Sequence, residues 1–153
     1  MIDVLVATEI DAPADAVWAV LVDFPRYAEW NPFIVRATGA AAIGARVHVR
    51  VSRGLRFAAK VLACEPNREL RWRGHFLGRR VASGEHTFAI EPIREGRVRL
   101  VQREVFEGLV PRLVGRLLAS EVRRGFEAMN VALKARAEAR ARTAAKDEPT
   151  VSP

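Results

Sequence analysis

Apolar and polar residues alternate through most of the first two thirds of the chain. In the first such stretch Val4, Val6 and Ile10 fall on one side, and a period of two is typical of a strand with one buried face. The pattern predicts seven strands: Ile2–Ile10, Phe33–Thr38, Ala45–Ser52, Leu55–Cys64, Glu69–Phe76, Val81–Glu91 and Arg97–Glu107. From residue 33 onwards every break between strands is short and contains glycine or proline, which implies antiparallel pairing.

Three other segments are predicted to be helical. Asp15–Val22 and Arg26–Trp30 are short, and a proline soon after each one stops it. The third runs from Pro111 to about Arg142 and carries apolar residues at helical spacing. We therefore expect an α+β arrangement in which the long helix covers the apolar face of a curved antiparallel sheet.

A length of 153 residues fits one domain. No internal repeat or linker divides the chain, so we expect a single domain over residues 1–142. Residues 143–153 are polar and end in proline, and we expect them to form a flexible tail.

The formal charge of +7 narrows the choice of partners. A basic helix can attract nucleic acid or anionic lipid. Because the outward face of the predicted sheet lacks the aromatic residues on which bases stack, we expect no nucleic acid, whereas transient contact with an anionic membrane stays open. Nothing in the sequence indicates an oligomeric state.

The sequence also favours a cytoplasmic location. Cys64 is the only cysteine, so an intrachain disulfide is excluded and a reducing compartment fits. The N-terminus has no basic region followed by a cleavage site, so we expect no secretory signal. The longest apolar run, Val17–Val22, is too short to span a bilayer.

Polar residues interrupt the apolar face of the last two predicted strands. Strand parity turns His86, Gln102 and Glu104 inward. If the hairpin closes between Glu91 and Arg97, His86 lies opposite Gln102 and diagonal to Glu104. A buried carboxylate needs a partner, a proton or water. Two interpretations stay open: the polar end of a ligand cavity, and a satisfied hydrogen-bond network without a ligand.

The predicted long helix carries two unusual residues within its apolar stripe. Glu121 and Gly125 lie where a core helix normally presents large apolar side chains. Glycine costs about 1 kcal/mol in helix propensity relative to alanine. We expect Gly125 to leave room for a cavity between the helix and the sheet.

Several motifs resemble those of a known superfamily. They are Ile10–Pro13, Asp23–Phe33, Gly84–Phe88 and Arg124–Asn130. Together they resemble the SRPBCC superfamily, also called START-like or birch-pollen-allergen-like, and within it the bacterial polyketide cyclase/dehydrase and lipid-transport group. The resemblance implies a helix-grip fold, in which a seven-stranded antiparallel sheet wraps around a long C-terminal helix, with two short helices after the first strand and a hydrophobic cavity.

We predict that the protein binds a hydrophobic or amphipathic small molecule (lipid, quinone or polyketide-like) as a carrier or sensor. The resemblance implies that Trp30 and Phe33 lie at the cavity mouth. The full set of predicted ligand-binding residues is Trp30, Phe33, Val49, Phe57, Trp72, His86, Phe88, Gln102, Glu104, Leu117, Glu121 and Phe126.

The alternative function is an enzyme of the cyclase or dehydratase type. In it His86 would act as general acid or base, and Glu104 would bring the imidazole pKa near neutrality. We expect no metal site, because His48 and His75 face outward without a matching set of ligands. No phosphate-binding loop or other cofactor motif occurs, so we expect no cofactor.

Overall fold

The structure is a computed structural model that describes residues 1–76 and 81–147. Seven strands form one antiparallel sheet in the order β1-β7-β6-β5-β4-β3-β2. The strands are β1 (Ile2–Ile10), β2 (Ile34–Thr38), β3 (Arg46–Val51), β4 (Arg56–Glu65), β5 (Glu69–Phe76), β6 (Ala82–Arg94) and β7 (Arg97–Glu107). All seven predicted strands are confirmed, with ends that differ by a few residues.

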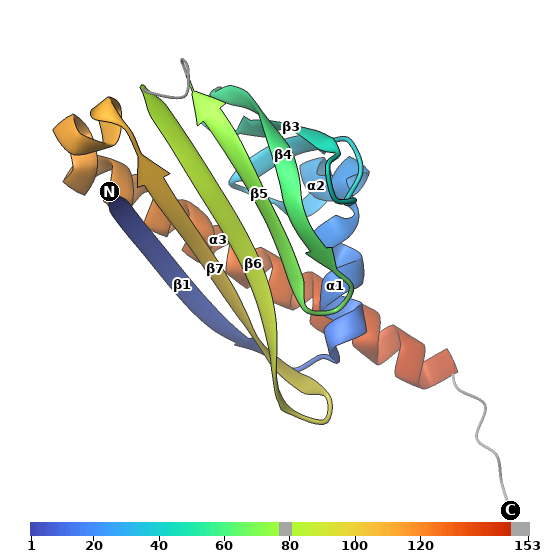
Figure 1. The fold of residues 1–153 in the computed structure, drawn as a ribbon. Coiled ribbons are helices and arrows are strands. Elements are labelled where there is room, and N and C mark those ends of the chain that lie inside the picture. Colours follow the sequence, from blue (N-terminus) through green and yellow to red (C-terminus); the bar gives the residue numbers. More distant parts are fainter. Residues whose placement is uncertain (77–80, 148–153) are drawn as a thin grey trace, which may run out of the picture.

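The helices complete a helix-grip α+β fold. After β1 come α1 (Ala14–Val22), the 3₁₀ turn η1 (Phe24–Arg26) and α2 (Tyr27–Trp30), and the chain ends in α3 (Leu109–Asp147). Figure 1 shows α3 crossing behind the curved sheet, with α1 and α2 beside it. None of the helices in the described ranges has the length and hydropathy needed to cross a bilayer.

Helix α3 is longer than the sequence predicted. It continues to Asp147, so the first five residues of the expected tail are helical, and residues 148–153 lie outside the described residues. The predicted break at residues 77–79 lies outside them too. The helix buries Val122, Phe126, Met129, Leu133 and Ala137 against the sheet, at the spacing of three and four residues that places side chains on one helix face.

The register of the β6–β7 hairpin differs from the prediction. His86 lies opposite Glu104, and Phe88 lies opposite Gln102. The strands continue past Glu91, through an irregularity after Pro92, before the chain reverses at Glu95-Gly96, where Gly96 has φ +68°. Because the pairing shifts by two residues, the inward face is as predicted, but the partner of His86 is not.

The inner face of the sheet supports two hydrophobic clusters. The larger one lies under the C-terminal half of α3, with Trp72 packed edge-on against Phe24 and Phe88. The smaller one lies under the middle of α3 and contains Phe106 and Phe126. Phe33 packs against both, so it stands where the two clusters meet.

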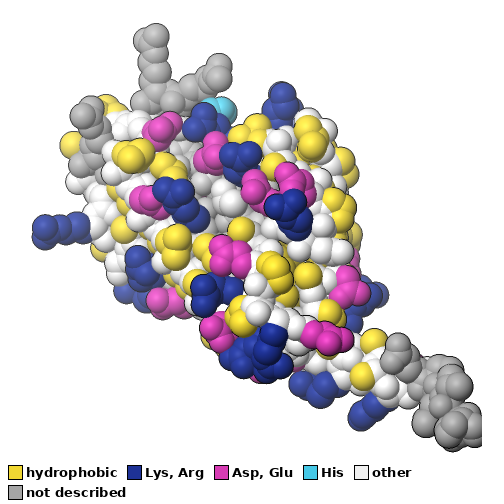
Figure 2. Space-filling view, turned by 60° about the horizontal axis from the view of Figure 1, so that its bottom comes forward, with side chains coloured by type: hydrophobic (Ala, Val, Ile, Leu, Met, Phe, Trp, Pro, Cys, Tyr) yellow, Lys and Arg dark blue, Asp and Glu magenta, His cyan; other side chains and the backbone are white. Residues whose placement is uncertain are grey.

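Charged side chains cover the outer face, as the alternation predicts. Over β5, β6, β7 and β1 the arginines have acidic partners on neighbouring strands: Arg73 contacts Glu85, Arg97 contacts Glu9, and Arg103 contacts Asp3. Figure 2 shows Lys and Arg side chains interspersed with Asp and Glu across one side of the molecule. On this part of the sheet the charges are compensated locally.

Candidate ligand-binding site

A cavity of about 380 Å³ lies between α3 and the sheet, and its lining includes residues of β2, β3, β4, β6 and β7. Its volume is in the range of small-molecule sites in proteins. Most of the lining is apolar, and His86 and Glu104 form a polar part of the wall. The lining residues are Phe33, Ile34, Val51, Ser52, Arg53, Leu55, Phe57, His86, Glu104, Phe106, Leu118, Glu121, Val122, Arg124 and Gly125.

The room beside Gly125 is occupied by Phe33. A β-carbon at residue 125 would overlap the Phe33 ring, so only glycine allows the ring to lie against the helix. The same ring meets Phe126 edge-on, with centroids 5.7 Å apart and planes at 80°. The prediction that Gly125 makes room is therefore correct, but an aromatic side chain fills that room and forms the cavity wall.

The polar wall is built on neighbouring strands. His86 and Glu104 are opposite residues of β6 and β7, and the His86 Nδ1 and Glu104 Oε2 atoms are 3.8 Å apart. The imidazole is stacked between Phe88 and Phe126, with centroid distances of 4.1 and 4.7 Å. The Glu104 carboxyl lies over Gly84, where a β-carbon would be 2.5 Å from Oε1. Packing thus fixes the positions of both polar groups.

A chain of side-chain hydrogen bonds links Thr8, Asn130, Gln102 and His86. Asn130 Nδ2 donates to Thr8 Oγ1 (3.2 Å), and Gln102 Nε2 donates to Asn130 Oδ1 (2.6 Å). Gln102 Oε1 therefore faces His86 Nε2 at 3.3 Å. Since an amide oxygen can only accept, this arrangement pairs it with a hydrogen on His86 Nε2. The unprotonated Nδ1 then faces Glu104.

Burial favours the neutral form of both members of this pair. Desolvation lowers the pKa of His86 to about 3, against a smaller opposite effect of its bond to Gln102. Desolvation also raises the pKa of Glu104 to about 8. The hypothesis that Glu104 brings the pKa of His86 near neutrality is wrong, because a protonated carboxyl gives the imidazole no charge to pair with.

The structure brings together some of the predicted ligand-binding residues and not others. Phe33, Phe57, His86, Glu104 and Glu121 line the cavity. Gln102 and Phe126 are not among the lining residues but contact His86: Gln102 is hydrogen-bonded to it, and Phe126 stacks on its ring. Val49, Trp72 and Phe88 belong to the larger hydrophobic cluster and do not line the cavity.

Trp30 and Leu117 are not at this cavity. Trp30 borders a separate surface pocket with Arg136 and Arg140. Leu117 is 69% exposed. The buried stripe of α3 passes through Leu118 and Val122, and Leu117 is turned about 100° from its neighbour at 100° per residue. The helical stripe drawn from the sequence was too wide.

Two parts of the site were not predicted from the sequence. The β3–β4 turn contributes Ser52, Arg53 and Leu55. In the sequence, the apolar Leu55 directly after the turn residue Gly54 could have indicated this contribution. Asn130 completes the hydrogen-bond chain, and an asparagine inside the apolar stripe of α3 marked it. Among the described residues, no three His, Cys, Asp or Glu side chains come together in a way that could hold a metal ion.

An ion pair connects the β3–β4 turn to α3 at the rim of the cavity. Arg53 Nη2 and Glu121 Oε2 are 2.7 Å apart, and Arg124 also contacts Glu121. The Arg53 side chain is 80% exposed, and exposed pairs contribute about 0–1 kcal/mol. Glu121 is thus a rim residue, half-buried and paired, rather than a group in the middle of the apolar stripe.

The sheet wrapped around α3, with a hollow between them, defines the helix-grip class of the SRPBCC, or START-like, superfamily. Residues 1–138 match the family model described as polyketide cyclase / dehydrase and lipid transport. The chain belongs to that family. No curated protein matches the sequence.

Solved structures show the same fold at low sequence identity. The Zhui aromatase/cyclase from Streptomyces sp. R1128 is 24% identical, with a TM-score of 0.73 over 93% of this chain and 96% of that one. A START superfamily protein from Mycobacterium smegmatis is 20% identical, with a TM-score of 0.72 over 93% and 98%. A protein from Mesorhizobium loti is 21% identical, with a TM-score of 0.71 over 88% and 95%.

Proposed function

We propose that the protein binds a hydrophobic or amphipathic small molecule, such as a lipid, a quinone or a polyketide-like ring, and acts as a carrier or sensor. The observation that carries this proposal is the cavity of about 380 Å³ beneath α3, with mostly apolar walls and two polar groups at one place. Apolar walls supply binding energy in proportion to the ligand surface removed from water. A few fixed polar groups supply orientation.

The polar pair suits an uncharged oxygen function on the ligand. His86 Nδ1 is a hydrogen-bond acceptor, and the protonated Glu104 carboxyl is a donor. A hydroxyl group can donate to the first and accept from the second, while a carbonyl can accept from Glu104 alone. Because neither protein group is charged, the ligand buries no unpaired ion when it enters.

We place the entrance for the ligand at the Arg53–Glu121 ion pair. It joins the β3–β4 turn to α3 at the rim, and its small free energy means that separating the two residues costs little. We infer that this turn moves away from α3 when a ligand enters.

Filling the cavity should abolish binding. We expect Leu118→Trp, which places an indole in the hollow, to weaken binding of a fluorescent fatty acid or a naphthoquinone at least tenfold, because the ligand and the indole compete for the same volume. Fluorescence titration measures the effect.

Leu117→Trp is the matched control, since it adds the same side chain one residue away on the exposed side of α3. It should bind the probes as the parent does. Equal affinity in Leu118→Trp and the parent, or no binding of either probe by the parent, would contradict the proposal.

A second candidate function is catalysis of the cyclase or dehydratase type. It is favoured by the pKa of Glu104, about 8, because a carboxylic acid that is still protonated at neutral pH can give its proton to a substrate. His86, with a pKa of about 3, is a weak base. The proton donor in this alternative is therefore Glu104, and His86 positions the reacting oxygen.

Glu104→Gln separates the carrier from the enzyme. The amide keeps a hydrogen-bond donor in the same place but has no acidic proton. For a carrier, probe affinity should change less than threefold and no turnover of any bound compound should be seen. For an enzyme, turnover of a cyclisable polyketide mimic by the parent should fall at least a hundredfold in the variant, as measured by chromatography of the products.

We also propose that a carrier meets membranes through the first half of α3. Leu109, Leu113 and Leu117 are 60%, 75% and 69% exposed and recur every four residues on one face of the helix. Arg116 directly precedes Leu117 in the chain. An exposed apolar helix face beside a basic residue suits binding to the surface of an anionic membrane. Flotation with phosphatidylglycerol vesicles should recover the parent and lose Leu113→Ser/Leu117→Ser. Equal recovery of both, or of neither, would reject the contact.

A further inference from the structure

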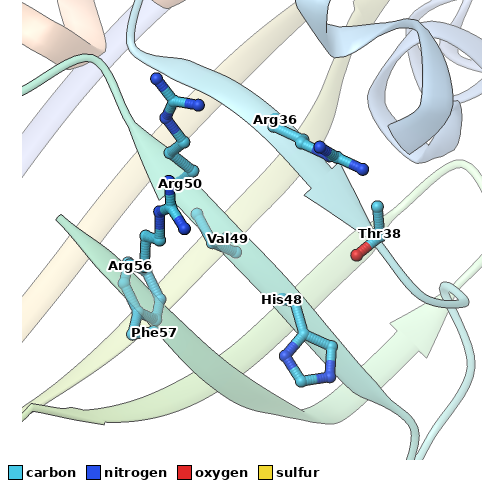
Figure 3. A pocket seen from close by; sticks show the side chains of 7 residues that line it. All are labelled: Arg36, Thr38, His48, Val49, Arg50, Arg56 and Phe57. Atoms are coloured by element: carbon cyan, nitrogen blue, oxygen red, sulfur yellow. The ribbon is translucent and has the colours of Figure 1, made fainter. Parts of the chain in front are cut away.

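The outer face of β2, β3 and β4 carries a row of three arginines. Arg36 on β2 lies opposite Arg50 on β3, and Arg50 lies opposite Arg56 on β4. Neighbouring strands are about 5 Å apart, so three cations project side by side from consecutive strands. Figure 3 shows these side chains coming from three adjacent strands, with His48 and Thr38 beside them.

This arginine row has no acidic partner among the described residues. Over residues 1–76 and 81–147 no carboxylate forms an ion pair with Arg36, Arg50 or Arg56. On β5, β6, β7 and β1, by contrast, the arginines meet acids across strands. Like charges placed directly opposite each other destabilise a sheet, so the row carries a cost that a bound anion would relieve.

The row borders a groove of about 430 Å³, which is lined by the three arginines, Thr38, His48 and parts of Val49 and Phe57. The guanidinium groups supply forked N–H donors, the type of group that binds phosphoryl oxygens in pairs. Thr38 and His48 face each other across β2 and β3 in the adjacent row. These side chains line the groove.

We propose that this groove binds a phosphoryl group carried by a small soluble molecule. A bound dianion would cancel the repulsion within the row, and its oxygens would accept from more than one guanidinium. The three arginines project from the face of the sheet opposite to α3, and Phe57 lines both this groove and the apolar cavity. The inference does not depend on the proposed function. A bilayer would meet only the projecting side chains.

Calorimetric titration with inorganic pyrophosphate tests the site. Arg50→Glu should weaken pyrophosphate binding at least tenfold, because it removes the central cation. Without any anion it should also raise the melting temperature by about 2 °C, because two repulsive cross-strand pairs become attractive. A row that merely supports the fold would give the opposite sign of temperature shift.

Arg94→Glu is the control for net charge. It makes the same change of charge on the β6–β7 hairpin, away from the groove, and should leave the affinity for pyrophosphate within twofold of the parent. No binding of pyrophosphate by the parent, an equal loss in both variants, or binding of phosphatidate vesicles or single-stranded DNA without pyrophosphate binding would overturn the proposal.

Discussion

Gly125→Ala should lower the free energy of unfolding by about 1 kcal/mol. In an ordinary helix this substitution gains about 1 kcal/mol of helix propensity. Here the new methyl group would overlap the Phe33 ring, which lies against the helix and meets Phe126 edge-on. Overpacking of this kind costs about 1–3 kcal/mol. We expect the clash to outweigh the propensity gain. Urea unfolding followed by circular dichroism measures the difference.

Shortening Phe33 should reverse the sign of this effect. In a Phe33→Ala background the space beside residue 125 is open, so adding Gly125→Ala should stabilise the protein by about 0.5–1 kcal/mol. The comparison is made within that background, since Phe33→Ala alone removes a packed ring. A destabilisation of similar size in both backgrounds would show that Phe33 is not the reason for the glycine.

Stability should fall as pH rises from about 6.5 to 8. The folded Glu104 keeps its proton up to about pH 8, while in the unfolded chain it ionises near 4.5. His86 does the reverse, since it loses its proton near 3 in the folded state and near 6.5 when unfolded. Between about 4.5 and 6.5 both states of the pair hold one proton, so their effects cancel. Above 6.5 only the folded state holds a proton.

The expected loss between pH 6.5 and 8 is about 2 kcal/mol, at 1.36 kcal/mol for each pH unit. Urea unfolding at intervals across this range measures it. Glu104→Gln has no such proton, so its stability should be flat over the same interval. A flat profile in the parent, or an equal fall in both proteins, would mean that Glu104 is already ionised in the folded state.

The alternation in the sequence predicted the strands and their inward faces but not the β6–β7 register. Period-two alternation located the strands because one face of each strand is buried, and it turned His86, Gln102 and Glu104 inward correctly. It could not set the β6–β7 register, because parity is unchanged by a shift of two residues. The choice depended on whether Pro92 ends the strand, and the strand continues past it as far as Arg94.

The candidate site was predicted in part for a similar reason. Polar residues on an apolar face are visible in a sequence, and so is Gly125 in an apolar helical stripe. Which neighbour fills the space is a matter of three-dimensional packing, and Phe33 could not be assigned to it from spacing. Leu117 was misplaced because a helical stripe has edges that only the partner sheet defines. The pKa of His86 depends on burial, which alternation does not quantify.

The most direct test of the central claim is native mass spectrometry of the parent and Leu118→Trp after incubation with a mixture of a fatty acid and a naphthoquinone. If the hollow beneath α3 is a ligand site, the parent should carry one added molecule that is released on denaturation, and the variant should show the mass of the bare chain. A bare parent, or the same adduct on both proteins, would contradict the account.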